Sequence, residues 1–303
     1  MAIKKHTHAR QILLACFIIL LIAFTGCKQQ NPSPRPLSAK EVKKLSAEIE
    51  RVSSAYIDAW NKHDTDLMGK LMTENIKYYE AGNYTTANGK LDLLSINSMV
   101  LFESPDFGGR QVDTYIGRAD GFDIWEMWNY AGSTQDNPYH AYDWYILTKG
   151  KISSMWLFWG FEVFARLWTP DHGSTFDQKP LEDYASAWSS GDTETVASLY
   201  APEVDRQDTL FKENQQGSSA VKEFATNFYT WYPGVRLELL QSFKLGDSTP
   251  VKTGGVYAMH VTDLAGKPCD VRAIILLEIS KDQITHEWLF YNADSLIACG
   301  WAQ

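Results

Sequence analysis

The sequence lacks an apolar run long enough to cross a bilayer. Its longest uncharged apolar stretch, from Ile12 to Phe24, covers about 13 residues, whereas a membrane-spanning helix needs about 20. Lys4, Lys5 and Arg10 precede this stretch. A short apolar run behind basic residues is typical of the core of a signal peptide, which is removed from the mature protein.

Several motifs of common enzyme classes are also missing. The chain has no glycine-rich phosphate loop, no Gly-x-Ser-x-Gly elbow and no His-Glu-x-x-His pair. These absences argue against nucleotide-dependent enzymes, common esterases and zinc peptidases. His140, His260 and His286 are single histidines on predicted strands and match no metal spacing. We therefore expect neither a metal nor a cofactor.

Basic residues are fewer than acidic residues. The chain has 28 Lys and Arg against 37 Asp and Glu. Loss of the signal removes three basic residues and no acidic one, so the mature protein carries a net charge of about −12. This balance argues against a nucleic-acid partner, which needs a basic face, and against adhesion to anionic lipid by charge.

Cysteine is rare, and one of the four cysteines closely follows the apolar stretch. The segment Phe24-Thr25-Gly26-Cys27 resembles the lipobox of bacterial lipoproteins. The resemblance implies that Cys27 becomes the acylated first residue, so that membrane contact is through this N-terminal anchor only. Lys28 in the next position favours the outer membrane, on the periplasmic side, in a Gram-negative cell. The alternative is an ordinary secreted protein cut nearby, in which Cys27 is incidental.

The remaining cysteines and the segment after Cys27 complete this extracytoplasmic interpretation. Cys16 leaves with the signal, and Cys269 and Cys299 either pair in the oxidising compartment or remain two separate thiols. Residues 28–37 are polar and contain three prolines, a composition typical of a flexible tether.

An internal repeat is the most informative feature of the chain. Six residues of one segment recur in the same order and spacing in a second: Tyr56, Ala59, Trp60, Asp64, Thr65 and Leu71 match Tyr184, Ala187, Trp188, Asp192, Thr193 and Leu199. A later match joins Ile152, Trp156, Leu157 and Phe158 to Ile284, Trp288, Leu289 and Phe290. We infer a duplication.

Each copy shows the same pattern of secondary structure. Ser38 and Glu41 form a capping box before a long amphipathic helix, and Asp64 is placed to cap a second, short helix. A strand is expected over 75–81, a third helix after Gly89, and antiparallel strands thereafter. The fold class is therefore α+β: two tandem cone-shaped domains, each with about three helices on a curved antiparallel sheet. The expected domains are 38–168 and 180–303, with 169–179 as linker.

The pattern Tyr-x-x-Ala-Trp-x-x-x-Asp in both copies resembles the SnoaL-like polyketide cyclases, of the nuclear-transport-factor-2-like superfamily of cone-shaped domains. The resemblance implies a fold rather than a function. Such domains include isomerases, cyclases, hydrolases, dehydratases and binding modules.

Within that superfamily, ketosteroid isomerases use a helix tyrosine, an acidic base and a second, protonated acid. The resemblance places these roles on Tyr56, Glu80 and Asp143 in the first copy. In the second copy Tyr184 and Asp208 match, the third position is Ile275, and His286 is an alternative acid-base partner for Asp208. In the alternative interpretation Tyr56 and Tyr184 are core residues, and Glu80 and Asp208 lie at exposed strand ends.

Tryptophans are abundant, and aromatic walls suit a flat apolar ligand. The expected pocket tryptophans are Trp60, Trp125, Trp144, Trp156, Trp188 and Trp288, with core packing or contact between the copies as the alternative. The leading hypothesis is a lipid-anchored protein that binds a small apolar molecule. Two others are an isomerase or cyclase that uses the first-copy acids, and an interaction module in which the copies form an intramolecular pseudo-dimer.

Overall fold

A computed structural model describes residues 37–80, 86–118, 120–160, 177–211, 213–245, 251–262 and 266–301. The expected signal peptide, the lipidation site Cys27, nearly all of the tether and most of the linker lie outside these ranges. Within them, no helix combines the length and the apolarity that a membrane crossing requires.

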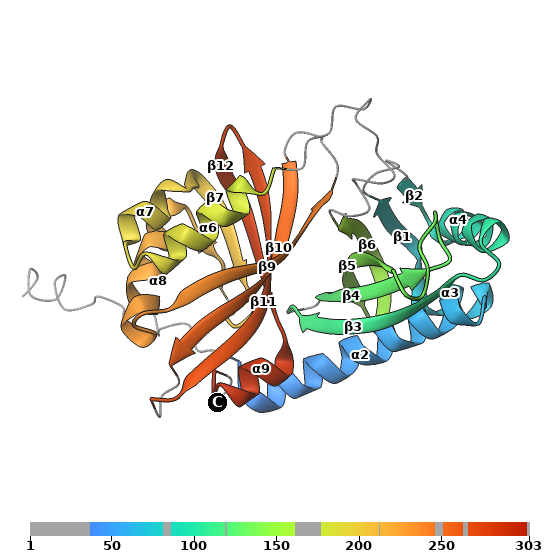
Figure 1. The fold of residues 1–303 in the computed structure, drawn as a ribbon, viewed down its shortest axis with the longest axis horizontal. Coiled ribbons are helices and arrows are strands. Elements are labelled where there is room, and N and C mark those ends of the chain that lie inside the picture. Colours follow the sequence, from blue (N-terminus) through green and yellow to red (C-terminus); the bar gives the residue numbers. More distant parts are fainter. Residues whose placement is uncertain are drawn as a thin grey trace, which may run out of the picture. The chain divides into compact units, whose positions relative to one another are not determined.

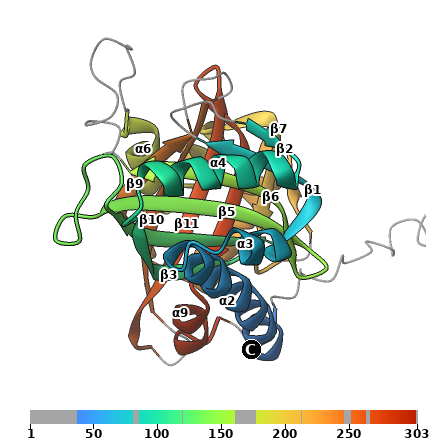
Figure 2. The same ribbon diagram turned by 90° about the vertical axis from the view of Figure 1, so that its right-hand side faces the viewer.

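The helices of the first half, residues 38–160, begin where the sequence predicts. Helix α2 (Ala39–Asn61) starts with the complete Ser38–Glu41 capping box. Asp64 caps α3 (Thr65–Leu71) by accepting a hydrogen bond from the backbone N–H of Leu67 over 2.8 Å. Helix α4 (Lys90–Glu103) follows Gly89, whose φ of 112° favours glycine. Figure 2 shows these helices in front of the first-half strands.

The strands of the first half form a sheet in the order β1-β6-β5-β4-β3, with β2 beside β1. They are β1 (Met72–Glu80), β2 (Thr86–Asn88), β3 (Gly108–Ile116), β4 (Asp120–Trp128), β5 (Tyr139–Thr148) and β6 (Lys151–Gly160). The expectation of a purely antiparallel sheet is wrong at one position, since β1 pairs with β6 in parallel. The chain passes through β2, α4 and the strands β3 to β5 before β6 returns beside β1, and β1 and β6 run the same way.

The second half, residues 179–301, repeats this order of elements (Figure 1). Its helices are α6 (Lys179–Ser189), α7 (Thr193–Ser198), α8 (Ser218–Trp231) and the additional α9 (Ala293–Ala298). Its strands are β7 (Tyr200–Asp208), β8 (Gln215–Gln216), β9 (Arg236–Leu245), β10 (Val251–Thr262), β11 (Pro268–Ser280) and β12 (Gln283–Tyr291). Here too the first long strand, β7, is parallel to the last, β12.

Of the two alternatives for the remaining cysteines, the structure contains the bonded pair. A disulfide joins Cys269 on β11 to Cys299 at the end of α9, with their Cα atoms 5.8 Å apart. The bridge ties the C-terminal helix to the sheet.

Each sheet has a helix-covered face and an opposite face, because side chains alternate along a strand. The opposite faces of the two halves pack together through buried apolar residues, here named the interface cluster: Tyr115, Phe122, Ile124, Tyr142, Trp144, Phe158, Phe243, Val256, Ile274, Leu276 and Phe290. Backbone pairing also joins the halves, at β6 with β9 and at β3 with β12.

Candidate functional site

The helix-covered face of the first half contains a pocket. Its free space, including the open mouth, is about 500 Å³. Helices α2 and α4 and all the strands from β4 to β6 contribute side chains, together with β1. The lining residues are Tyr56, Trp60, Tyr78, Glu80, Ile96, Asn97, Val100, Phe107, Trp125, Met127, Tyr130, Asp143, Met155, Leu157 and Trp159.

The structure brings the three predicted first-half residues together in this pocket. Tyr56 comes from α2, Glu80 from the end of β1 and Asp143 from the middle of β5. Tyr56 and Asp143 are buried, and Glu80 is half-buried. The alternative interpretation placed Glu80 and Asp208 at exposed strand ends, and it is wrong for Asp208, which is buried at the end of β7.

Asp143 has the environment of a neutral carboxylic acid. Burial raises its pKa well above the usual value, and the neighbouring acids Asp123 and Glu80 raise it further. The polar indole of the nearby Trp125 lowers this pKa by a smaller amount. Its Oδ1 atom has no hydrogen-bond partner among the described residues. A carboxyl group in this environment keeps its proton to higher pH than an exposed aspartate, and in the protonated form it can donate a hydrogen bond.

Tyr56 is held beside Asp143 by aromatic packing. Its ring makes edge-on contacts with Trp60 and Trp125, at centroid distances of 6.3 and 6.1 Å. Burial is the main cause that raises the pKa of Tyr56, so its hydroxyl remains protonated. The indole N–H groups of Trp60 and Trp125 have no partner in the described part of the chain.

Glu80 lies in the same pocket beside two tyrosines that the sequence analysis did not single out. Tyr78 donates a hydrogen bond to Oε2 of Glu80 over 3.3 Å. Tyr130 stacks on Trp159 at 5.9 Å, and burial with the charge of Glu80 raises its pKa to about 12. Tyr78 could have been found from strand periodicity, since it lies two residues before Glu80 on the same face.

Three of the predicted pocket tryptophans lie instead at the contact between the two halves. Trp144, Trp156 and Trp288 belong to the interface cluster or pack against it, and Trp144 stacks on Trp156 at 4.3 Å. Trp144 also donates to Oδ2 of Asp120 over 3.1 Å. The prediction was wrong because neighbouring strand residues face opposite ways, and Asp143 already occupies the pocket side.

Trp60 and Trp125 do line the pocket, as predicted, and Trp188 does not. Trp188 is buried in the second half, where its indole N–H donates to the hydroxyl of Tyr200 over 3.1 Å. Trp159 lines the first-half pocket although it was not assigned there.

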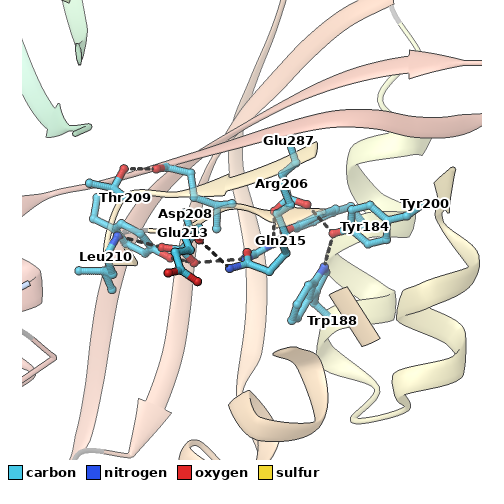
Figure 3. Close-up of polar contacts among 12 residues, drawn as sticks. Tyr184, Trp188, Tyr200, Arg206, Asp208, Thr209, Leu210, Glu213, Gln215 and Glu287 are labelled. Atoms are coloured by element: carbon cyan, nitrogen blue, oxygen red, sulfur yellow. Dashed lines mark hydrogen bonds and ion pairs between the residues drawn. The ribbon is translucent and has the colours of Figure 1, made fainter. Parts of the chain in front are cut away.

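In the second half, charged residues occupy the positions that line the first-half pocket. Arg206 corresponds to Tyr78 in the repeat, and Glu287 to Met155. Tyr184 donates to Oε1 of Glu287 over 2.8 Å, and Nε of Arg206 donates to the same oxygen over 3.1 Å (Figure 3). Burial alone would lower the pKa of Arg206, but Glu287 and Asp208 raise it above its ordinary value. The guanidinium is therefore charged.

Asp208 is part of this network rather than a free base. It accepts hydrogen bonds from Nη2 of Arg206 over 3.3 Å and from the hydroxyl of Tyr291 over 3.1 Å. The alternative in which His286 and Asp208 form an acid-base pair is wrong. His286 lies on the other face of β12, 3.1 Å from Oε1 of Glu278, and stacks on Trp288 at 5.5 Å.

Ile275, the second-half counterpart of Asp143, is fully buried in the apolar core. The second half therefore lacks the pocket acid and places a salt-bridged cluster around Tyr184. Among the described residues there is no group of side chains arranged to hold a metal ion.

Comparisons with known proteins identify the fold of the second half. Residues 179–298 match the family model of the SnoaL-like polyketide cyclase. This match supports a SnoaL-like, nuclear-transport-factor-2-like domain in that part of the chain. A comparison with curated proteins gave no match.

Solved structures resemble the chain over about one domain. A protein from Catenulispora acidiphila with a ketosteroid isomerase-like fold, in complex with trimethylamine, is 17% identical, covers 42% of this chain and 96% of its own, and has a TM-score of 0.36. A SnoaL-like protein of unknown function from Burkholderia thailandensis is 17% identical, with coverages of 37% and 95% and a TM-score of 0.33. An NTF2-like protein of unknown function from Cytophaga hutchinsonii is 16% identical, with coverages of 43% and 91% and a TM-score of 0.29.

Proposed function

We propose that the first-half pocket binds a small, largely apolar molecule through an acceptor oxygen. One observation carries this proposal. Three buried polar atoms without partners among the described residues line the same pocket: Oδ1 of Asp143, Nε1 of Trp60 and Nε1 of Trp125. An unpaired buried polar group costs about 1–3 kcal/mol, so a ligand that pairs with these groups recovers that free energy.

The chemistry of these groups limits the ligand. With its pKa raised, Asp143 is a donor, and the two indoles and the hydroxyl of Tyr56 are donors as well. A carbonyl, phenolate or similar oxygen of a ligand can accept hydrogen bonds from these donors. The other lining residues, such as Ile96, are mainly apolar or aromatic and suit a hydrocarbon body.

The test compares 2-naphthol with naphthalene, which has the same rings and no oxygen. We expect the protein to bind 2-naphthol at least tenfold more tightly, as measured by quenching of tryptophan fluorescence. Tyr56→Phe removes one donor and should reduce this preference, while the matched second-half variant Tyr184→Phe should leave it unchanged. Equal affinities for the two probes in the unmodified protein would overturn the proposal.

A second candidate is an isomerase or cyclase at the same site, and Glu80 is the observation that favours it. This carboxylate lines the pocket that contains the donors Tyr56 and Asp143. In that reaction Glu80 takes a proton from the carbon next to a carbonyl, the carbonyl oxygen gains negative charge, and the two donors stabilise it. Return of the proton to another carbon completes an isomerisation.

The test of this candidate follows hydrogen-deuterium exchange at the α-carbon of 2-tetralone in D₂O. The protein should accelerate exchange above the background rate. Glu80→Gln should abolish the acceleration and preserve binding of 2-naphthol. Exchange at the background rate in the unmodified protein would leave binding as the only function of the pocket.

We further propose that the protein is anchored outside the cytoplasm through Cys27 and that the second half supports the first. The interface cluster and the β6–β9 pairing favour an intramolecular pseudo-dimer over docking to another protein through the sheet. Labelling of cells with palmitate tests the anchor: the label should be lost in Cys27→Ala, and equal labelling of both proteins would disprove it.

A further inference from the structure

A second buried acid lies directly beside the pocket acid. Asp123 on β4 is the cross-strand neighbour of Asp143 on β5. Both side chains are on the helix-covered face, and only 3% and 2% of the two residues is exposed. Such neighbours have Cβ atoms about 4.5–5.5 Å apart, so the two carboxyl groups interact strongly.

The two acids differ in their hydrogen bonds. Oδ1 of Asp123 accepts from Oγ1 of Thr114 over 3.0 Å and from Nε2 of Gln111 over 3.3 Å. Oδ1 of Asp143 has no partner among the described residues. Donors stabilise a carboxylate rather than a neutral acid, so this arrangement favours the negative charge on Asp123.

Neighbouring groups do not change this order. Glu80 on β1 adds a negative charge that raises the pKa of Asp143. Tyr56 on α2, Tyr78 on β1 and Tyr145 on β5 remain neutral, because burial raises the pKa of each. The first proton that leaves the pair therefore leaves Asp123, and the resulting charge opposes ionisation of Asp143.

We propose that Asp123 is a positioning residue that takes the negative charge of this pair and thereby holds Asp143 in its protonated, hydrogen-bond-donating form. The inference rests on the proposed function of the pocket, in which Asp143 donates to the ligand. Asp123 itself does not line the pocket, so it acts through Asp143.

Carboxyl ¹³C NMR of protein labelled at aspartate, recorded as a function of pH, tests the proposal without any ligand. In Asp123→Asn the titration midpoint of Asp143 should fall by at least one pH unit. Thr114→Val removes a donor from Asp123 and should raise the midpoint of Asp123. An unchanged Asp143 midpoint in Asp123→Asn would overturn the proposal.

Asp143→Asn gives an independent result should Asp123→Asn fail to fold. If Asp143 is neutral while Asp123 ionises, removal of its carboxyl should leave the Asp123 midpoint within about half a pH unit. A fall of one unit or more would mean that Asp143 ionises first, against the proposal. Because the titration needs no ligand, it decides the role of Asp123 even where 2-naphthol fails to bind and the proposed function falls.

Discussion

Tyr184 donates a 2.8 Å hydrogen bond to Glu287, whereas its repeat counterpart Tyr56 faces an open pocket beside Asp143. The same position on the first long helix thus donates to a buried carboxylate in one half and lines a pocket in the other. The difference supports the proposal that the first half binds a ligand and that the second half stabilises it. This division makes several predictions.

Glu287→Gln should strongly destabilise the protein. The substitution removes one of two carboxylates that compensate the buried guanidinium of Arg206. Loss of one partner from a buried ion pair costs about 3–5 kcal/mol. Urea denaturation measures the free energy of unfolding. The exposed pair of Lys179 and Asp183 provides the control, since Asp183→Asn should leave that free energy unchanged within error. If Glu287→Gln changed the free energy of unfolding as little as Asp183→Asn, the proposed role of Glu287 beside Arg206 would be contradicted.

Two tryptophan variants should separate ligand binding from stability. Trp125→Phe removes a pocket donor and should weaken 2-naphthol binding about three- to tenfold, in line with about 1 kcal/mol for one hydrogen bond. Trp144→Phe removes the stacking on Trp156 and the bond to Asp120, so it should lower stability by about 1–2 kcal/mol and leave affinity unchanged. Fluorescence titration and urea denaturation of both variants check this, and a reversed pattern would show that the faces are misassigned.

Stability should fall with rising pH through the contribution of Asp123. Burial raises its pKa to about 7, whereas an unfolded aspartate ionises near 3.9. Between these values the native state holds the proton more tightly than the unfolded state, so the favourable contribution is complete below about pH 4 and lost by about pH 7.

Asp123→Asn has no such titration. From pH 4 to pH 7.5 the unmodified protein should therefore lose about 2–4 kcal/mol more unfolding free energy than the variant. Urea denaturation at the two pH values measures this difference. A shift in the opposite direction would show that native Asp123 ionises more easily than in the unfolded chain.

Reduction of the disulfide should lower stability without affecting the pocket. Cys269 and Cys299 are 30 residues apart, and closing a loop of this size is worth about 3–4 kcal/mol in the chain-entropy model. The double variant Cys269→Ser, Cys299→Ser should show this loss in urea denaturation and bind 2-naphthol normally. Loss of binding would mean that the bridge supports the first half as well.

Local signals in the sequence predicted a good part of the fold. The Ser38–Glu41 box and the Asp64 cap depend on residues three positions apart, and both form as expected. Tyr56, Glu80 and Asp143 were placed by resemblance to a family pattern, and the structure brings them together in one pocket.

The errors arose where strand direction or distant partners decide the outcome. Asp143 and Trp144 are adjacent on β5, so their side chains point to opposite faces of the sheet and only one of them can line the pocket. The hydrogen bond between Tyr184 and Glu287 joins residues 103 positions apart, so no local sequence pattern predicts it. Asp123 was missed for the same reason, because its importance comes from its register with Asp143.

The pairing of β6 with β9 and of β3 with β12 also affects how the chain avoids self-association. In each half one outer strand, β3 or β9, is hydrogen-bonded to a strand of the other half. An unpaired strand edge is a template on which further chains can add and aggregate. A first half produced alone would expose such edges together with the rings of Phe122 and Phe158. Covalent fusion supplies the covering partner at a fixed one-to-one ratio in every complete chain. The exposed edges and rings of one molecule are thereby kept from pairing with those of another.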